Sequence, residues 1–227
     1  MLIKTISPKD NMFQGNYEHY FNVGESAIEC IRLAIKLSRN QSIHNVLDLP
    51  CGYGRVLRTI KNEFPEAQIT ACDLEKDGVD FCADTFSAVG VYSDNDLSKI
   101  NLNGKFDLIW CGSLITHIDM YHAQEFLDFF IKKLETNGIL VVTVHGWNSF
   151  NLLERYGAID VEKIRREYNA CGYGYSDYKG FESYGISIMK PSWIMSYLEQ
   201  SKNTRLLYYS ERLWDEHQDV LAVQKVV

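Results

Sequence analysis

Short runs of almost uninterrupted apolar residues alternate along the chain with longer stretches in which apolar residues recur at helical spacing. The apolar runs predict strands at 45–49, 68–72, 90–92, 106–111 and 139–144, and the stretches between them predict helices at about 54–63, 76–86 and 120–135. Strands without polar alternation, separated by helices, indicate a parallel sheet that is covered on both faces. The crossover connections are expected to be right-handed.

Polar and turn-forming residues suggest where some helices begin and end. Residues 1–22 are polar and aromatic, and apolar residues at near-helical spacing then run from Gly24 to Asn40. Asp119 is placed to cap the helix that begins at about residue 120, and Asn137-Gly138 is expected to close that helix.

The pattern changes after His145-Gly146. The segment 148–170 is predicted to be helical, and 172–185 is a stretch dense in glycine and tyrosine. Further elements are expected as a short strand at 186–189, a helix from Pro191 to about 200, and two strands at 204–212 and 219–226. The last two strands form an antiparallel hairpin. The predicted fold is therefore α/β, Rossmann-like and doubly wound, with a seven-stranded, mostly parallel sheet that ends in this hairpin.

A tight glycine turn follows the first predicted strand, and an acid follows the second. The turn is Pro50-Cys51-Gly52-Tyr53-Gly54, and the acid is Asp73. An α/β protein holds an adenosine-containing cofactor in this way, because glycines let the backbone approach the ligand and the acid binds the ribose hydroxyls. The dinucleotide fingerprint asks for a third small residue three positions beyond Gly54, where this chain has Leu57. These details favour S-adenosylmethionine over a dinucleotide.

On these residues the chain resembles the class I S-adenosylmethionine-dependent methyltransferases. The family pattern is an acid, one further residue, and then three glycines at alternate positions. Asp48, Gly52 and Gly54 match this pattern, whereas Pro50 replaces the first glycine, which fixes φ and removes a backbone donor. The generic part of the resemblance covers 46–145. Segments such as Trp110–Leu114 are similar to a bacterial subgroup of poorly defined substrate.

The resemblance implies a set of cofactor-binding residues that follow successive strands. Asp48 and the loop backbone would hold the methionine end, although Asp48 as an organiser of the turn is an alternative. Asp73 would bind the ribose and Leu74 would pack on the adenine. Asp94 is preferred for the adenine amino group, with Asn95 and Asp96 as alternatives. The full set is Asp48, Pro50, Cys51, Gly52, Gly54, Asp73, Leu74, Ser93, Asp94, Asn95, Cys111, Gly112 and Ser113.

Two histidines follow strands on the side where sites of open α/β sheets lie. His117 comes six positions after Cys111 and is the first candidate for a general base, because an ordinary histidine pKa of about 6.5 suits proton removal at neutral pH. His145 ends its strand and is the rival candidate. Cys51 has no evident histidine partner in the sequence, which argues against a catalytic thiolate.

Aromatic residues are the candidates for contact with the acceptor. Tyr17 and Tyr20 are possible lid residues, and Tyr175, Tyr178 and Tyr184 belong to the glycine- and tyrosine-rich stretch. Aromatic faces with interspersed glycine suit a mobile lid over a ring-shaped or sugar-like acceptor. Packing of a tail onto the domain, or of a surface loop onto the helix after Pro191, is the alternative.

The amino-acid composition limits the classes of molecule that the protein is expected to bind. The net charge is −7, from 23 basic and 30 acidic residues, which argues against nucleic acid as a partner. The six cysteines include no Cys-x-x-Cys pair, as in reduced cytoplasmic proteins, and neither a signal segment nor a membrane span is expected. No spacing typical of a metal site is present in the sequence. Nothing in it fixes an oligomeric state.

We therefore expect one methyltransferase domain that acts on a small-molecule or saccharide acceptor, most readily at oxygen. Its parts are expected as an N-terminal lid and helix (1–44), a cofactor-binding core (45–145), an acceptor-side insertion (146–203) and a closing hairpin (204–227). An NAD(P)-dependent oxidoreductase of the same topology is one alternative, against which Leu57 and the terminal hairpin count. A non-catalytic protein that binds S-adenosylmethionine is the other.

Overall fold

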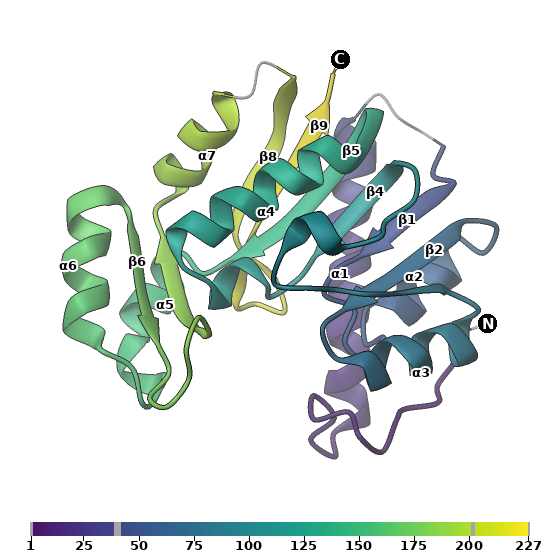
Figure 1. The fold of residues 1–227 in the computed structure, drawn as a ribbon, viewed down its shortest axis with the longest axis horizontal. Helices are drawn as coiled ribbons and strands as arrows, with labels where there is room; N and C mark the ends of the chain where they lie inside the picture. Colours follow the sequence, from purple (N-terminus) through teal and green to yellow (C-terminus); the bar gives the residue numbers. More distant parts are fainter. Residues whose placement is uncertain (1, 39–41, 201–202, 227) are drawn as a thin grey trace.

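The computed structural model describes residues 2–38, 42–200 and 203–226. A seven-stranded sheet runs through it in the order β3-β2-β1-β4-β5-β9-β8 (Figure 1). The strands are β1 (Asn45–Asp48), β2 (Gln68–Asp73), β3 (Val89–Tyr92), β4 (Phe106–Cys111), β5 (Leu134–Val144), β8 (Thr204–Trp214) and β9 (Gln218–Lys225). Strands β1 to β5 pair in parallel, and β9 lies antiparallel between β5 and β8. The predicted mostly parallel sheet with its closing hairpin is confirmed.

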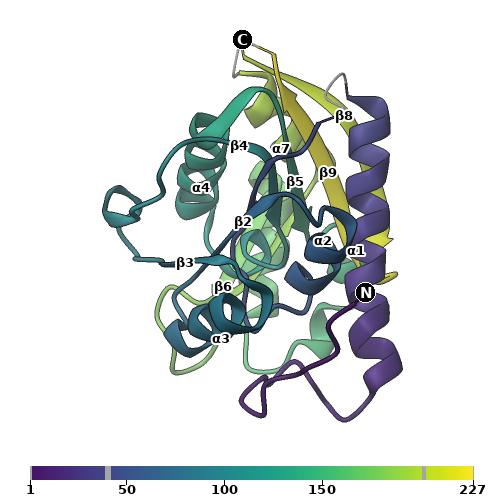
Figure 2. The ribbon, with the colours of Figure 1, turned by 90° about the vertical axis from the view of Figure 1, so that its right-hand side faces the viewer.

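Helices cover both faces of this sheet, with α1 and α4 on opposite sides of it (Figure 2). They are α1 (Tyr17–Leu37), α2 (Leu57–Glu63) and α3 (Lys76–Phe86) on one face, and α4 (Met120–Lys133) and α7 (Pro191–Glu199) on the other. Successive strand side chains point to opposite faces. Val46 accordingly packs in the core beneath α1, and Leu47 in the core beneath α4.

A smaller unit with a core of its own extends beyond the end of β5. This satellite unit, residues 147–189, contains α5 (Trp147–Asn151), η3 (Leu153–Arg155), α6 (Val161–Cys171), β6 (Tyr173–Asp177) and β7 (Gly185–Met189). Figure 1 shows it to one side of the main sheet. β6 and β7 form a separate antiparallel sheet. Its apolar core consists of Phe150, Leu153, Ile164, Tyr168, Ile186 and Ile188.

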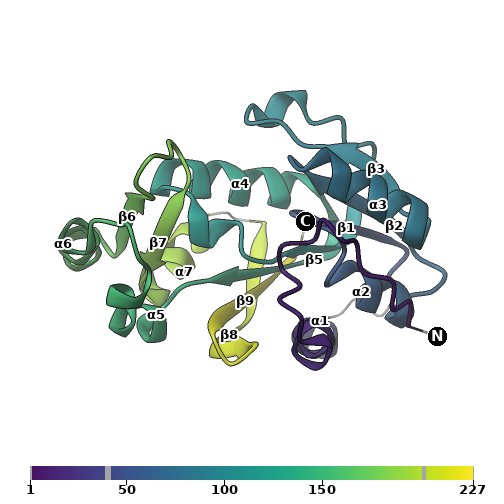
Figure 3. The same ribbon diagram turned by 90° about the horizontal axis from the view of Figure 1, so that it is seen from below.

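The N-terminal residues form a strap that crosses the molecule between α1 and α3 (Figure 3). We call residues 2–16 the strap. Arg58 of α2 is buried and donates to the backbone carbonyls of Ile3 (3.2 Å) and Thr5 (2.8 Å), while Lys9 forms an ion pair with Asp77 of α3. The strap is thus fastened near its start to α2 and at its middle to α3.

The first helix begins earlier than its apolar pattern predicts. It starts at Tyr17 and not Gly24, because the side chain of Asn16 accepts a hydrogen bond from the His19 backbone N–H (3.0 Å) and caps it. It ends at Leu37, and the predicted end at Asn40 lies outside the described residues. A cap can extend a helix beyond its apolar periodicity, since the cap satisfies free backbone donors locally.

The expected helix end at Asn137-Gly138 is wrong. The cap at Asp119 is confirmed, with its side chain accepting from the His122 N–H, but α4 ends at Lys133 and β5 begins at Leu134. Asn137 adopts a positive φ of 67°, and a Cβ at Gly138 would lie 2.7 Å from the Phe106 carbonyl oxygen. The Asn-Gly pair therefore marks an irregularity within a long strand.

Two other boundaries also differ from the prediction. The helix expected over 54–63 begins only at Leu57, because the glycine turn continues to that point. The helix expected over 148–170 is divided into α5, η3 and α6. In 172–185 the chain forms β6 (Tyr173–Asp177) before it turns, although no strand was predicted there.

Cysteine side chains are all free thiols in the described structure. Five are buried and Cys171 is exposed. No helix among the residues 2–38, 42–200 and 203–226 is long and apolar enough to cross a membrane.

Candidate active site

A cleft of about 860 Å³ lies at the carboxyl ends of the parallel strands. Residues 10–12 of the strap and residues 182–184 of the β6–β7 loop also line it. Of the residues singled out from the sequence, those that line it are Asp48, Pro50, Cys51, Gly52, Asp73, Leu74, Ser93, Asp94, Asn95, Gly112, Ser113, His117 and Tyr184. Residues that follow different strands thus meet in one cavity, as expected for an open parallel sheet.

The glycine turn lies directly beneath this cleft. The Gly52 N–H donates to Asp73 Oδ2 (2.7 Å), and the Cys51 N–H donates to the Cys72 carbonyl (3.0 Å), which ties the turn to the end of β2. Gly52 and Gly54 both have positive φ, 49° and 74°, which favours glycine. The Leu49–Pro50 peptide bond is cis. The turn exposes backbone to the cleft at Gly52, where no atom lies within 4 Å of a would-be Cβ.

Two predicted residues, Gly54 and Cys111, do not line the cleft. A Cβ at Gly54 would lie 2.6 Å from Cε2 of Phe86, so this glycine is required by the packing of the turn on α3. Cys111 is buried in the core on the α4 face of the sheet. We therefore correct both from cofactor contacts to supports of the cleft.

Asp48 is the most unusual polar residue of the cleft. Its side chain is buried, and neither carboxylate oxygen has a hydrogen-bond partner among the described residues. Burial, and secondarily the charge of Asp73, raises the pKa of Asp48 well above its ordinary value. A buried carboxylate without donors is costly in isolation, and a cationic ligand would relieve that cost.

The acids after β2 and β3 are oriented by backbone donors. Asp73 Oδ1 accepts from the Glu75 N–H (2.9 Å), and Asp94 Oδ1 accepts from the Asp96 N–H (2.9 Å). Asp96 is used differently, because its side chain caps the short helix η1 (Leu97–Lys99) and does not line the cleft. Of the alternatives weighed for the adenine position, Asp94 and Asn95 therefore reach the cleft and Asp96 does not.

Ser113 is held at the end of β4 by a closed set of hydrogen bonds. Its N–H donates to Thr143 Oγ1 (2.8 Å), the Thr143 hydroxyl donates to Gln218 Oε1 (2.6 Å), and Gln218 Nε2 donates to Ser113 Oγ (2.7 Å). This network fixes Ser113 at a positive φ of 59°. β4, β5 and β9 thus jointly position a residue that faces the cleft.

His117 lies on η2 (Ile115–His117), and its ring faces the cleft. Its Nδ1 is 2.8 Å from the Gly185 carbonyl oxygen, which only accepts, so Nδ1 carries the proton and Nε2 keeps a lone pair. Burial lowers the pKa of His117 below its ordinary value. The ring also stacks on Tyr184, with centroids 5.0 Å apart. His117 is therefore a neutral imidazole of fixed orientation near pH 7.

Comparison with known proteins finds a similarity to methyltransferases. Residues 47–140 match the sequence profile of a family described as "Methyltransferase domain". Over 139 residues the chain is 22% identical to malonyl-[acyl-carrier protein] O-methyltransferase of Acetivibrio thermocellus, in an alignment that covers 61% of this chain and 48% of that protein. The aligned part thus spans about half the length of this curated relative.

Solved structures share the fold over almost the whole chain. One is a S-adenosylmethionine-dependent methyltransferase from Clostridium acetobutylicum ATCC 824, with a TM-score of 0.62, 16% identity and coverage of 95% of this chain and 94% of that one. Another is the N-methyltransferase NodS from Bradyrhizobium japonicum WM9 in complex with S-adenosyl-l-homocysteine, with a TM-score of 0.58, 14% identity and coverage of 96% and 93%.

Residues 47–140 thus match a methyltransferase domain, and nearly the whole chain shares the fold of S-adenosylmethionine-dependent methyltransferases. The cofactor of these methyltransferases fits the cleft. Asp48 offers an unpartnered buried carboxylate to an ammonium group, and Asp73 and Asp94 present carboxylates where hydroxyl and amino donors are expected. No group of His, Cys, Asp and Glu side chains suited to a metal ion is found in the part of the chain that the structure describes.

The second candidate base, His145, is not presented to the cleft. His145 is 3% exposed and does not line the cleft, and its Nδ1 is 3.3 Å from the Ser187 carbonyl oxygen. Burial, followed by the nearby His117 and His217, lowers the pKa of His145 to about 3. We correct it from a rival base to a buried neighbour of His117, whose ring centroid lies 6.4 Å away.

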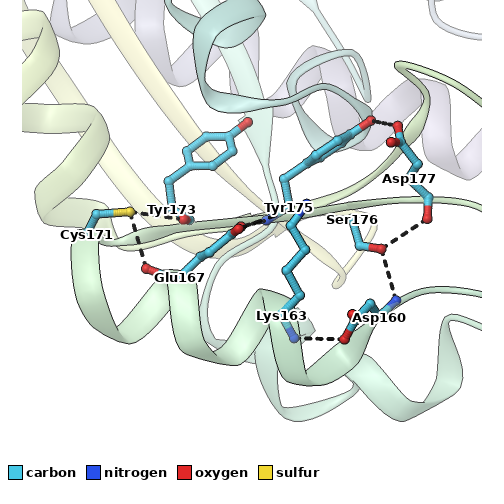
Figure 4. A network of polar contacts seen from close by, with 8 residues as sticks. All are labelled: Asp160, Lys163, Glu167, Cys171, Tyr173, Tyr175, Ser176 and Asp177. Atoms are coloured by element: carbon cyan, nitrogen blue, oxygen red, sulfur yellow. Dashed lines mark hydrogen bonds and ion pairs between the residues drawn. The ribbon is translucent and has the colours of Figure 1, made fainter.

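Four of the tyrosines proposed for acceptor contact lie outside the cleft. Tyr17 is exposed and packs on Phe13, whereas Tyr20 is 1% exposed and donates through its hydroxyl to Asp10 Oδ2 (2.6 Å), which secures the strap. Tyr175 is buried in β6, and Figure 4 shows its hydroxyl bonded to Asp177 (2.6 Å). Tyr178 contacts the rings of His117 and Tyr184 from behind the lining.

Figure 4 also shows why the Tyr175 segment is a strand and not a loop. Glu167 of α6 accepts from the Tyr175 N–H (3.1 Å), and Ser176 Oγ accepts from the Asp160 N–H (2.9 Å). These contacts fix β6 against α6. The adjoining β6–β7 loop nevertheless supplies Tyr184, so one of the five predicted tyrosines lines the cleft.

Several lining residues were not predicted from the sequence. They include Asp10 and Met12 of the strap, Arg55, Phe126 and Trp214. The position of Arg55 directly after Gly54 was a usable signal, since residues that follow the glycine turn share its location. The others come from segments that only tertiary packing brings to the cleft.

Proposed function

We propose that this methyltransferase transfers a methyl group from S-adenosylmethionine to a hydroxyl of a small-molecule or saccharide acceptor, with His117 as the general base. The observation that carries the proposal is the bond between His117 Nδ1 and the Gly185 carbonyl (2.8 Å). That bond leaves Nε2 as the ring's free acceptor in a residue that lines the cleft.

When bound, the cofactor supplies a methyl group that is activated by its attachment to a sulfonium. The residues of this chain then have to align the acceptor and remove its proton. His117 can do so at neutral pH because its lowered pKa keeps it unprotonated. Protonation of Nε2 produces an imidazolium whose Nδ1–H is already bonded to Gly185, so the ring need not rotate. General-base catalysis of this kind is typically worth about 10²- to 10⁴-fold in rate.

We propose that the acceptor occupies the end of the cleft near α4 and the β6–β7 loop. This end is lined by Ile118, His122 and Phe126 on one side and by Glu182, Ser183 and Tyr184 on the other. The mixture of apolar, aromatic and polar side chains suits a ring that carries hydroxyl groups. The segment 146–203 would then act as the acceptor-side part of the molecule.

The proposal is tested with purified protein, S-adenosylmethionine and a panel of hydroxylated small molecules and saccharides, by following S-adenosylhomocysteine formation. His117→Ala should lower kcat by about 10²-fold or more on an accepted substrate. The control is His44→Ala, because His44 is exposed and precedes β1, at the opposite edge of the sheet. Equal rates for His117→Ala and the wild type, with every accepted substrate, would refute the base assignment.

Calorimetric titration separates this proposal from the alternatives. We expect the protein to bind S-adenosylhomocysteine and not NADH. Tighter binding of NADH would favour the oxidoreductase alternative. Binding without turnover of any acceptor would favour a non-catalytic protein. If only amines are methylated, and the rate of His117→Ala equals that of the wild type, the acceptor atom is nitrogen and not oxygen.

A further inference from the structure

Two histidines line the acceptor end of the cleft, and the protein holds both rings in the same way. His117 Nδ1 is bonded to the Gly185 carbonyl oxygen (2.8 Å), and His122 Nδ1 is bonded to Asp119 Oδ2 (2.9 Å). Within the described ranges, neither Nε2 atom has a hydrogen-bond partner. Each ring therefore has one nitrogen that is fixed by the protein and one that is available to a ligand.

Asp119 directs both of its carboxylate oxygens at His122. Oδ1 accepts from the His122 backbone N–H (3.0 Å) and caps α4, while Oδ2 binds the ring. Burial by itself raises the pKa of Asp119, but its hydrogen bonds to His122 outweigh burial, and the pKa lies below its ordinary value. An ionised carboxylate thus sets the orientation of the His122 ring and keeps a proton on Nδ1.

The position of His122 on α4 gives its ring a use beyond the helix cap. The cap itself needs only the backbone N–H of this residue and one oxygen of Asp119. His122 and Phe126 lie four residues apart on α4, which places them on the same side of the helix, and both line the cleft. Tyr121, which does not line the cleft, is exposed. One side of α4 therefore presents a polar group and an apolar surface to the same ligand.

The surfaces next to the two histidines suit the faces of a ring. Ile118 and Phe126 line the cleft on one side, and Tyr184 of the β6–β7 loop lines it on the other. The Tyr184 ring stacks on His117, with centroids 5.0 Å apart. Apolar and aromatic side chains bind a ring through its faces, whereas imidazole nitrogens bind its polar substituents.

The acids at this end of the cleft disfavour an anionic substituent. Glu182 lines the cleft, and Asp119 is bonded to the far side of the His122 ring. When His122 is protonated, its charge is balanced by Asp119, so no net positive charge remains to attract an anion. The substituent that fits beside His122 is therefore an uncharged oxygen, either a hydroxyl or a carbonyl.

We propose that His122 is an acceptor-binding residue, which holds a second, uncharged oxygen of the acceptor ring while His117 faces the hydroxyl that is methylated. The preferred acceptors are then rings with two oxygen substituents. Nε2 accepts from a hydroxyl when the imidazole is neutral, and it donates to a hydroxyl or carbonyl when the imidazole is protonated. Binding at two points restricts rotation of the ring and so selects the hydroxyl that meets His117. The inference deepens the proposed function and rests on it.

The test uses rings that differ by one oxygen: phenol against catechol and resorcinol, and cyclohexanol against its vicinal diol. Each is titrated into protein saturated with S-adenosylhomocysteine, and NMR follows the Cε1–H signals of the histidine rings. This measurement requires no methyl transfer. The variants are His122→Ala, His122→Gln and Asp119→Asn. The control is His44→Ala, because His44 is exposed and precedes β1, at the opposite edge of the sheet. Thermal unfolding reports on the stability of each protein.

At least one ring with two oxygens should bind the wild type about 10- to 100-fold more tightly than its one-oxygen counterpart, and it should shift the signals of both His117 and His122. His122→Ala should abolish this preference and bind the one-oxygen rings as the wild type does. His122→Gln should recover part of the preference, because its amide offers a hydrogen bond close to the position of Nε2. Asp119→Asn should keep the cap of α4 and lose part of the preference.

Equal affinities of the wild type for one-oxygen and two-oxygen rings, absence of binding included, would overturn the proposal. So would an equal loss for both kinds of ring in His122→Ala together with a lower melting temperature, because that result indicates a structural residue. Undiminished methylation by His117→Ala would refute the proposed base and leave the preference due to His122 standing. Failure of the wild type to bind S-adenosylhomocysteine would refute the proposed cofactor, and the rings are then titrated into the free protein.

Discussion

Asp48 shows how one side chain can oppose folding and favour ligand binding at the same time. It ends β1 with a buried carboxylate that lacks hydrogen-bond donors among the described residues. Its raised pKa means that folding favours the protonated form. The unfavourable contribution of Asp48 is therefore absent below the unfolded pKa of about 3.9, and stability falls as pH rises through the folded pKa.

Replacement of Asp48 by Asn should stabilise the free protein and weaken cofactor binding. At pH 7 we expect the free energy of unfolding to rise by about 1–3 kcal/mol, because a desolvated carboxylate is removed. Affinity for S-adenosylhomocysteine should fall, because its ammonium loses an anionic partner. Urea unfolding and calorimetry at pH 7 measure the two effects.

Asp84→Asn is the control for this prediction, because Asp84 is exposed on α3 and the same chemical change there removes no buried charge. Neither stability nor affinity should change by more than about 0.5 kcal/mol in that variant. Loss of stability in Asp48→Asn would instead identify Asp48 as an organiser of the turn.

At the scale of elements, the glycine turn depends on α3 as much as on its own sequence. A Cβ at Gly54 would lie 3.0 Å from Cys82 Sγ in addition to its close contact with Phe86. A Cβ on Gly78 of α3 would lie 2.5 Å from the Gly52 carbonyl oxygen. The turn and the helix therefore approach each other through two glycines, one from each side.

Gly54→Ala should destabilise the protein by about 2–5 kcal/mol, the sum of a strained positive φ and overpacking against Phe86. Gly104→Ala has nearly the same φ, 75°, but no atom within 4 Å of the added Cβ, so only about 1–2 kcal/mol is expected there. Chemical denaturation gives both values. Equal losses would show that contact with Phe86 has no energetic role.

The pairing of β6 with β7 fixes the position of the Gly185 carbonyl, which accepts the hydrogen bond from His117 Nδ1. A Cβ at Gly185 would lie 1.9 Å from the Ser176 carbonyl oxygen, so Gly185→Ala must displace the start of β7. We expect kcat to fall by at least about tenfold while S-adenosylhomocysteine affinity is retained. Steady-state kinetics and calorimetry separate these effects.

Gly180→Ala in the same loop is the comparison for Gly185→Ala, because its added Cβ would meet nothing within 4 Å. Its kcat should stay within about twofold of the wild type. A similar loss of kcat in both variants would mean that the loop as a whole, and not the Gly185 carbonyl, controls the rate.

The success of sequence-based prediction differed among elements for physical reasons. Buried parallel strands such as β4 (Phe106–Cys111) are recognisable because both of their faces are apolar. β6 reads Tyr-Gly-Tyr-Ser, and its glycine looks like a loop signal. Gly174 is nevertheless required within a strand, since a Cβ there would lie 2.2 Å from the Ile164 carbonyl of α6. That reason exists only in the packed structure.

At the scale of the whole molecule, buried histidines couple stability to pH. The pKa of His145 is lowered to about 3, mainly by burial, so the unfolded chain binds one more proton between about pH 6.5 and about pH 3. Its contribution to stability is therefore complete above pH 6.5 and is lost as pH falls through that window. The lowered pKa of His117 acts in the same direction.

We expect His145 to decrease the free energy of unfolding by up to about 1.4 kcal/mol per pH unit as pH falls from 6.5 to 4. His145→Gln should reduce the slope of the free energy of unfolding against pH by the contribution of one titrating histidine. Urea unfolding at several pH values measures it. An unchanged slope in His145→Gln would show that folding does not shift the pKa of His145.

The candidate site could be predicted as far as it follows the strands. Asp48, Asp73, Asp94 and His117 lie in the cleft because the carboxyl ends of parallel strands share one edge. Asp10 and Trp214 reach the cleft through a strap and a hairpin, whose positions depend on tertiary contacts such as the bond from Trp214 Nε1 to the Val23 carbonyl (3.0 Å). Local sequence contains no signal for such contacts.

The satellite unit has an apolar core that is separate from the two cores of the main sheet. Mutations within it, at Ile164 or Ile186 for example, can accumulate without disturbing the packing beneath the glycine turn. Its β6–β7 loop nevertheless forms one wall of the cleft. Descendants of this chain could therefore diverge in what they modify while they inherit an unaltered nucleoside site, and grafting 147–189 between homologues is a practical route to new selectivity.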